Sequence, residues 1–276
     1  MESRRMCPNC RAFVSSADSV CPYCEVELKP RRASSPRRSS PVLGGVVPHA
    51  HFTTVLLLTI NLGLYLVTVV YSMRAGNEQA FFGLDGRTLF EFGAKYGEAI
   101  LAGQWWRLVT AGFLHGGLLH ILMNSWVLFD LGAQVEDVYG TARFIVFYFL
   151  ATIFGFYVSA AWNPGLSVGS SAGLFGLIGA MIAFGLKDRT GMGAAVRGLY
   201  VRWAIYGLII GFLPGIDNAA HIGGGIAGFA IAYMAGVPSM FESIGERLWR
   251  YAAVACVIIT AYCFLQMFFW LTRSGV

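Results

Sequence analysis

The chain has 276 residues, of which 56% are hydrophobic and only 13% are charged, whereas soluble domains carry about 25% charged residues. This composition excludes a disordered protein, a secreted disulfide-rich scaffold and an ordinary soluble enzyme. The net charge is +5, and residues 1–40 hold eight Lys and Arg against four Asp and Glu. The basic excess therefore belongs mainly to a short N-terminal arm, and no nucleic-acid partner is expected.

This arm contains four cysteines with the spacing C-x2-C-x10-C-x2-C, namely Cys7, Cys10, Cys21 and Cys24. Two such knuckles suit the tetrahedral four-thiolate geometry of structural zinc, and the segment resembles a zinc ribbon. We expect residues 1–29 to form this module with Zn²⁺ as a structural cofactor, because so short a chain cannot fold on its own core. The alternative is a pair of disulfides, which the reducing cytosol disfavours, since the arm shows no signal peptide.

A basic linker rich in Ser and Pro, residues 30–50, leads to a series of apolar segments, and we expect it to lie against anionic lipid headgroups. Seven segments approach the length and apolarity that a membrane-crossing helix needs. They span residues 52–72, 113–131, 144–162, 168–186, 198–213, 219–237 and 251–271. The sequence therefore predicts an all-α polytopic membrane protein.

The basic residues also predict the orientation in the membrane. Lys and Arg gather in the linker and in the turns after the fourth and sixth segments, whereas the turns at 163–165 and 214–218 have none. By the positive-inside rule, we expect the N-terminus in the cytosol and the C-terminus on the opposite side. The connection at 73–112 contains four basic residues and is the exception, but long loops follow this rule weakly.

Four polar residues lie inside these predicted helices, where polar groups are costly and often functional. They are His120 and Asn124 in the second helix, Ser171 in the fourth and His221 in the sixth. The three helices all run from the outer to the inner side, and each carries its polar residues in the first turns. The four side chains should therefore lie at a similar depth below the outer surface.

The chemistry of these residue types suits acyl transfer. A serine such as Ser171 becomes a nucleophile when a base accepts its proton, and the imidazole of His221 is a suitable base. His120 and Asn124 are four residues apart on one helix face and offer donors for an oxyanion. Since no Asp or Glu lies at this depth in the fourth or sixth helix, the sequence predicts a Ser–His dyad without a carboxylate third member.

Small residues recur at helical spacing in the fourth and sixth helices, which allows two helices to pack closely. They are Ala172, Gly176, Gly179 and Ala183 in the fourth, and Gly225, Gly228 and Ala232 in the sixth, with Gly224 beside them. We expect these stripes to bring Ser171 and His221 together.

Five motifs in this order resemble those of rhomboid intramembrane serine proteases. They are Trp106-Arg107, His115-x4-His120-x3-Asn124, Gly132-x3-Glu136-x3-Gly140 followed by Arg143-Phe144, Gly169-Ser170-Ser171-Ala172-Gly173, and Ala220-His221-Ile222-Gly223-Gly224. The resemblance covers about residues 50–240. It implies a six-helix rhomboid-like core at 51–238, with an additional C-terminal transmembrane helix at 239–276.

The same resemblance implies an intramembrane serine endopeptidase with Ser171 as the nucleophile and His221 as the general base. His120 and Asn124 would form the oxyanion hole, and Phe175 would pack on the catalytic histidine. The implied substrates are transmembrane proteins, cut near the outer face of the bilayer, and catalysis would need no cofactor.

One residue departs from the family pattern, because Ala172 stands where the glycine after the nucleophile is expected. The alternative is therefore a catalytically inactive rhomboid-like protein that binds transmembrane clients. Ser170 is an alternative nucleophile, but the spacing to Phe175-Gly176 favours Ser171. A transporter or channel is a third class, and it is disfavoured because the polar residues gather in the outer half of the helices.

Overall fold

The structure is a computed structural model that divides the chain into two compact units, Met1–Ser40 and Pro41–Val276. It describes residues 4–7, 9–10, 12–15, 18–28, 52–238 and 243–273. The predicted linker, residues 30–50, lies outside the described residues.

The N-terminal unit is a small β-structure around its cysteines. Strand β1 (Arg4–Met6) pairs antiparallel with β2 (Phe13–Ser15), and an isolated bridge joins Val20 to Glu27. Its core consists of four buried side chains, Cys7, Val14, Cys21 and Leu28. Such a core is too small to stabilise a fold by itself, which agrees with a module that depends on metal.

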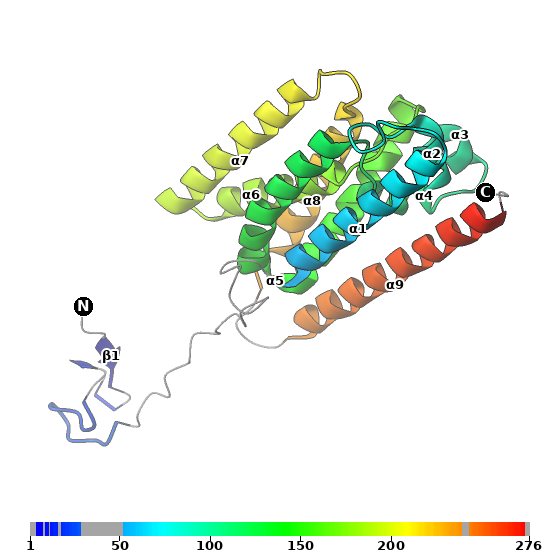
Figure 1. The fold of residues 1–276 in the computed structure, drawn as a ribbon. Coiled ribbons are helices and arrows are strands. Elements are labelled where there is room, and N and C mark those ends of the chain that lie inside the picture. Colours follow the sequence, from blue (N-terminus) through cyan, green and yellow to red (C-terminus); the bar gives the residue numbers. More distant parts are fainter. Residues whose placement is uncertain are drawn as a thin grey trace. The chain divides into compact units, whose positions relative to one another are not determined.

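The second unit is built from helices (Figure 1). In chain order they are α1 (Phe52–Arg74), α2 (Gly86–Glu91), α3 (Gly97–Leu101), α4 (Arg107–Thr110), the 3-10 turn η2 (Ala111–Phe113), α5 (Leu118–Trp162), α6 (Ser171–Lys187), α7 (Gly191–Ile210), α8 (Asn218–Ala235) and α9 (Ile244–Arg273). Helix α6 is central and mostly buried, because α5, α7 and α8 all pack against it. Helices α7 and α9 flank the bundle on opposite sides.

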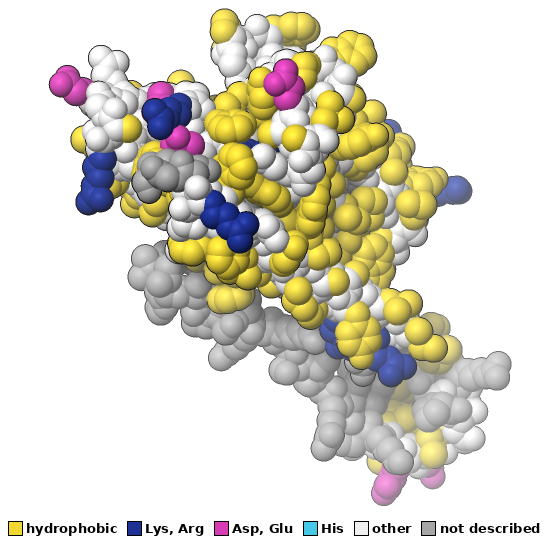
Figure 2. Space-filling view, turned by 90° about the vertical axis from the view of Figure 1, so that its right-hand side faces the viewer, with side chains coloured by type: hydrophobic (Ala, Val, Ile, Leu, Met, Phe, Trp, Pro, Cys, Tyr) yellow, Lys and Arg dark blue, Asp and Glu magenta, His cyan; other side chains and the backbone are white. Residues whose placement is uncertain are grey.

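The predicted all-helical membrane fold is confirmed. Within the described ranges, α1, α5 and α9 are long and apolar enough to cross a membrane, and α6 is a shorter apolar helix. Large hydrophobic side chains are exposed along the helices, and Figure 2 shows a broad hydrophobic surface on one face of the helical unit. Exposed apolar surface of this extent is what the bilayer core requires.

Helix α5 contains the predicted segment 144–162 and the segment 113–131 from Leu118 onward, with no separate loop between them. Gly140 has φ 74° and ψ 161°, a non-helical conformation that separates α5 into two arms. Both ends of α5 meet the loop before α4, since Leu84 N donates to Gly116 O (2.9 Å) and Gly97 N donates to Pro164 O (2.7 Å). The two arms therefore run antiparallel, and each is long enough to serve as one span.

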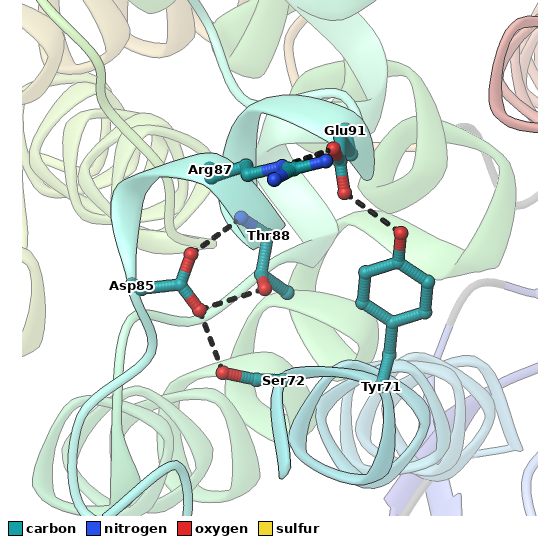
Figure 3. Close-up of polar contacts among 6 residues, drawn as sticks. All are labelled: Tyr71, Ser72, Asp85, Arg87, Thr88 and Glu91. Atoms are coloured by element: carbon teal, nitrogen blue, oxygen red, sulfur yellow. Dashed lines mark hydrogen bonds and ion pairs between the residues drawn. The ribbon is translucent and has the colours of Figure 1, made fainter. Parts of the chain in front are cut away.

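The connection between α1 and α5 is a folded cap of short helices, held by polar contacts at its start (Figure 3). Asp85 caps α2 by accepting from Thr88 N (2.8 Å), and it also accepts from Ser72 Oγ (2.7 Å) at the end of α1. Burial raises the pKa of Asp85, but hydrogen bonds from Thr88 and Ser72 outweigh this effect and lower it to about 2. The carboxylate is therefore charged at neutral pH and anchors α2 to α1.

Arg107 organises the rest of this cap. Its side chain is completely buried, and it donates from Nη1 to Phe90 O (2.6 Å) and Ala94 O (3.1 Å), and from Nε to Gln104 Oε1 (2.6 Å). These bonds fix three separate turns of the loop on one guanidinium. The structure thus gives a physical reason for the Trp106-Arg107 motif.

Helix α9 is attached to the core by a bidentate ion pair. Arg143 in α5 donates to both carboxylate oxygens of Glu246 in α9, at 2.7 and 3.0 Å, and its guanidinium lies 5.1 Å from the ring centre of Trp249. Planar, two-point contacts of this kind fix orientation as well as distance.

Candidate active site

Ser171 is the first residue of α6, and a sharp turn at Gly169 precedes it. Gly169 has φ 132°, a conformation that side chains other than glycine rarely adopt. A Cβ at Gly169 would lie 2.7 Å from His120 Nε2 and 3.6 Å from Ser171 Oγ. The absence of a side chain at residue 169 therefore leaves open the space between the His120 ring and the Ser171 hydroxyl.

His221 lies in the first turn of α8, whose start is capped by Asp217. The Asp217 Oδ1 atom accepts from Ala220 N (3.1 Å), which satisfies one of the free N–H groups at the helix start. His221 is 6% exposed, and Ser171 is half-buried. Both residues are thus at one end of their helices, at the same end of the unit as the folded cap.

The structure brings Ser171 and His221 into direct contact. His221 Nε2 lies 2.8 Å from Ser171 Oγ, which is hydrogen-bond distance. The ring of Phe175, one turn after Ser171, stacks on the imidazole with 4.2 Å between ring centres and 10° between planes. His221 Nδ1 has no hydrogen-bond partner among the described residues, so no carboxylate there makes a third member.

Glycines let α6 and α8 approach to backbone contact. A Cβ at Gly224 would lie 2.1 Å from Ala172 O, and one at Gly228 would lie 2.0 Å from Gly176 O. A Cβ at Gly225 has more room, with Phe175 O as its nearest atom at 3.7 Å. The predicted close packing of the two helices is present, and Gly224 and Gly228 are the glycines of α8 at which a side chain would meet the α6 backbone.

His120 and Asn124 lie on successive turns of α5 and differ in their contacts. Gly116 N donates to His120 Nδ1 (3.4 Å), which leaves Nε2 to carry the proton and donate toward the space beside Ser171. Asn124 Nδ2 instead donates to His120 O (3.0 Å) within its own helix. The structure therefore places His120 beside Ser171 and gives Asn124 a bond to the backbone of the same turn.

Ser170 and Ala172, which flank Ser171, point elsewhere. Ser170 is completely buried, and its Oγ lies 3.4 Å from His115 Nε2. Ala172 packs against α5, where a Cβ on Gly155 would lie 3.0 Å from the Ala172 methyl carbon. The methyl group that departs from the family pattern thus occupies the space left by Gly155.

Sequence reasoning missed three residues around this site. The residue types alone predict no role for His115, yet it is buried and its ring centre lies 5.2 Å from that of His120. Lys95 and Asp217 lie in two connections far apart in the sequence, and the structure brings Lys95 Nζ within 3.8 Å of Asp217 Oδ2. The available signal is that Asp217 is the one charged residue in the turn at 214–218.

The four N-terminal cysteines form a second candidate site, which fits a metal ion. Their sulfur atoms lie within 4.8 Å of one another, with 3.6 Å between Cys7 and Cys24 and 3.7 Å between Cys10 and Cys21. A tetrahedral zinc with Zn–S bonds of about 2.3 Å has sulfur atoms about 3.8 Å apart. All four cysteines are free thiols, and the disfavoured alternative of two disulfides is not formed.

We expect the purified protein of residues 1–276 to contain one zinc ion per chain, measured by elemental analysis. Cys21→Ser should lose the ion, because a closed structural site needs all four thiolates. Cys263→Ser is the matched control, since Cys263 is a buried thiol in α9, and it should retain the zinc. Zinc content that is unchanged in Cys21→Ser would contradict this assignment.

Comparisons with known proteins match the helical unit to one family. The family model described as "Rhomboid domain" matches residues 102–238. The chain is 38% identical over 162 residues to Rhomboid protease GluP of Bacillus subtilis (strain 168), covering 58% of this chain and 32% of the relative. It is 32% identical over 170 residues to RHOMBOID-like protein 6, mitochondrial, of Arabidopsis thaliana, covering 59% of this chain and 55% of the relative.

A third relative is named as inactive. Inactive RHOMBOID-like protein 8 of Arabidopsis thaliana is 33% identical over 161 residues, covering 57% of this chain and 46% of that relative. The chain thus spans less than two thirds of the length of each of these three relatives. The folded helices, the motifs and these matches together show that the chain carries a rhomboid domain and belongs to the rhomboid family.

Proposed function

We propose that the protein is an intramembrane serine endopeptidase that hydrolyses peptide bonds of transmembrane proteins with a Ser171–His221 dyad. The observation that carries this proposal is the 2.8 Å contact between Ser171 Oγ and His221 Nε2. It joins two helices whose remaining residues are mostly apolar, where a polar pair is costly unless it has a function.

The geometry supports a two-stage acyl transfer. Ser171 Oγ attacks the substrate carbonyl carbon while His221 Nε2 accepts the hydroxyl proton, and His221 then donates this proton to the leaving amine. Water, activated by His221 in the same way, hydrolyses the acyl-enzyme and restores the serine. Phe175 stacks on the face of the imidazole and holds its plane, which is the orienting role that a carboxylate on Nδ1 has in a triad.

The oxyanion formed in each stage needs donors that are already in place. His120 Nε2 faces the open space at Gly169, and the Ser171 backbone N–H lies at the free N-terminal end of α6. We propose these two groups as the main donors. Asn124, the other predicted member, would contribute by turning its amide from His120 O toward the substrate.

We also propose the topology predicted from the basic residues, with the N-terminus in the cytosol and the C-terminus on the opposite side. Ser171 and His221 then lie near the outer surface, where water for acyl-enzyme hydrolysis is close. Substrates would be transmembrane proteins, cut near that face. The zinc module, residues 1–29, would lie in the cytosol and take no part in the reaction, and the linker at 30–50 would follow it.

A non-catalytic client-binding protein is the second candidate, favoured by the relative that is named inactive and by Ala172. The packing of the Ala172 methyl against Gly155 weakens this reading, because it leaves the space beside Ser171 open. The two candidates differ in one property, the reactivity of Ser171.

Labelling with a fluorophosphonate probe tests this difference, because the probe reacts with a serine only when a base activates it. The wild-type protein in detergent should be labelled, and Ser171→Ala should not. Ser170→Ala is the matched control and should be labelled like the wild type. Labelling that persists in Ser171→Ala and disappears in Ser170→Ala would contradict the assignment, and an unlabelled wild type would favour the client-binding protein.

A further inference from the structure

A lysine lies fully buried in the folded cap, close to the candidate active site. Lys95, between α2 and α3, has no exposed surface. Its ammonium donates to Asn163 O (2.7 Å) and Gly165 O (2.8 Å) and lies 3.8 Å from Asp217 Oδ2. Burying an ammonium costs several kcal/mol even after relaxation, so its three partners must offset a large penalty.

Asp217 connects this lysine to the helix that carries His221. One carboxylate oxygen, Oδ1, caps α8 through Ala220 N (3.1 Å). The other, Oδ2, accepts a hydrogen bond from Ser159 Oγ near the end of α5 and faces Lys95. Burial raises the pKa of Asp217, but hydrogen bonds led by the one from Ser159 outweigh it and hold the pKa below its usual value. The carboxylate is therefore charged at neutral pH.

Lys95 also holds the segment that leads to Ser171. Its backbone forms a two-way bridge with Ser167, from Lys95 N to Ser167 O (2.9 Å) and from Ser167 N to Lys95 O (3.0 Å). Two residues later, Gly169 N donates to Ala111 O (2.9 Å). The turn that ends at Ser171 is therefore fixed by the residue whose side chain reaches the start of α8.

We propose that Lys95 and Asp217 act as a positioning pair, which sets the distance between Ser171 and His221 by holding both of their chain segments on one ion pair. This inference rests on the proposed function. Asp217 O accepts a hydrogen bond from His221 N (3.2 Å), and the pair acts on the dyad through this first turn of α8 and through the turn at 163–169. A 1 Å misplacement of reacting groups costs about 100-fold in rate. Loss of such a pair should therefore lower the catalytic rate strongly.

Steady-state kinetics on a single-span reporter protein in liposomes test the pair through Lys95→Met, Asp217→Asn and the double variant. Each single change should lower kcat about tenfold or more and leave KM within about twofold. The kcat of the double variant should be no lower than that of the less active single variant, because both changes break the same link. Lys187→Met, which removes a lysine at the opposite end of α6, should keep the wild-type kcat.

The proposal is overturned if kcat of Lys95→Met stays within about twofold of wild type, if KM alone changes, or if the two losses multiply. Asp217→Asn keeps the shape of the side chain and thus covers the case in which Lys95→Met does not fold. Melting temperatures identify that case.

Hydrogen exchange in the Ser171→Ala background gives a readout that needs no activity. Lys95→Met should speed amide exchange in residues 163–169 and 217–221, and Lys187→Met should not. Unchanged exchange in both segments would overturn the positioning pair whatever the kinetics show. If the wild type neither cleaves nor reacts with the probe while exchange changes as expected, the proposed function fails and the link between the two segments stands.

Discussion

Replacing Ser171 with alanine should lower the rate of reporter cleavage in liposomes by about 1,000-fold or more, and His221→Ala should reach the same low rate. In dyads and triads the nucleophile and the base act as one unit, so loss of either removes nearly the whole chemical step. The 2.8 Å contact between Ser171 Oγ and His221 Nε2 makes these two residues such a unit. The measurement is the initial rate of product formation on a gel.

The double variant sharpens this test, because it should be no slower than either single variant. Ser170→Ala should retain most of the activity, since Ser170 Oγ faces His115 and not His221. Cleavage that is lost in only one of the two single variants would contradict a dyad. If cleavage activity survives in both single variants, the catalytic residues lie elsewhere on the chain.

The sequence predicted the helices well because membrane spans are long apolar runs, a strong one-dimensional signal. It also predicted that Ser171 and His221 approach each other, because parallel helices of known direction place their first turns at one depth. The exact face of α8 was less certain, since neighbouring positions on a helix differ by about 100°. Gly225 and Gly228 of the predicted stripe both lie against α6, and the tightest approaches to its backbone are at Gly224 and Gly228.

Two other features of the fold could not be predicted from the sequence. The second and third segments are joined without a loop, because a single non-helical residue, Gly140, separates the two arms of α5. The pairing of Lys95 with Asp217 joins residues more than 100 positions apart. Such contacts depend on how loops fold over the helix ends, and no periodic pattern records that arrangement.

Gly228→Ala should damage both stability and activity, although it adds one methyl group. The new Cβ would lie 2.0 Å from Gly176 O and 2.5 Å from Gly176 Cα, and because these are backbone atoms the helices must move apart. Overpacking of this kind costs about 1–3 kcal/mol. Separation of α6 from α8 would also stretch the Ser171–His221 contact, and we expect cleavage to fall by about 100-fold.

Gly225→Ala is the matched control, three residues earlier on the same helix. Its Cβ would meet Phe175 O at 3.7 Å, an ordinary contact distance, and alanine in place of a helical glycine is favourable by about 0.5–1 kcal/mol. Its melting temperature and cleavage rate should equal or exceed those of the wild type. If Gly228→Ala cleaves as fast as Gly225→Ala, backbone contact between α6 and α8 does not set the geometry of the dyad. A loss of fluorophosphonate labelling in Gly228→Ala, at a temperature where the variant remains folded, would place the damage at Ser171 itself.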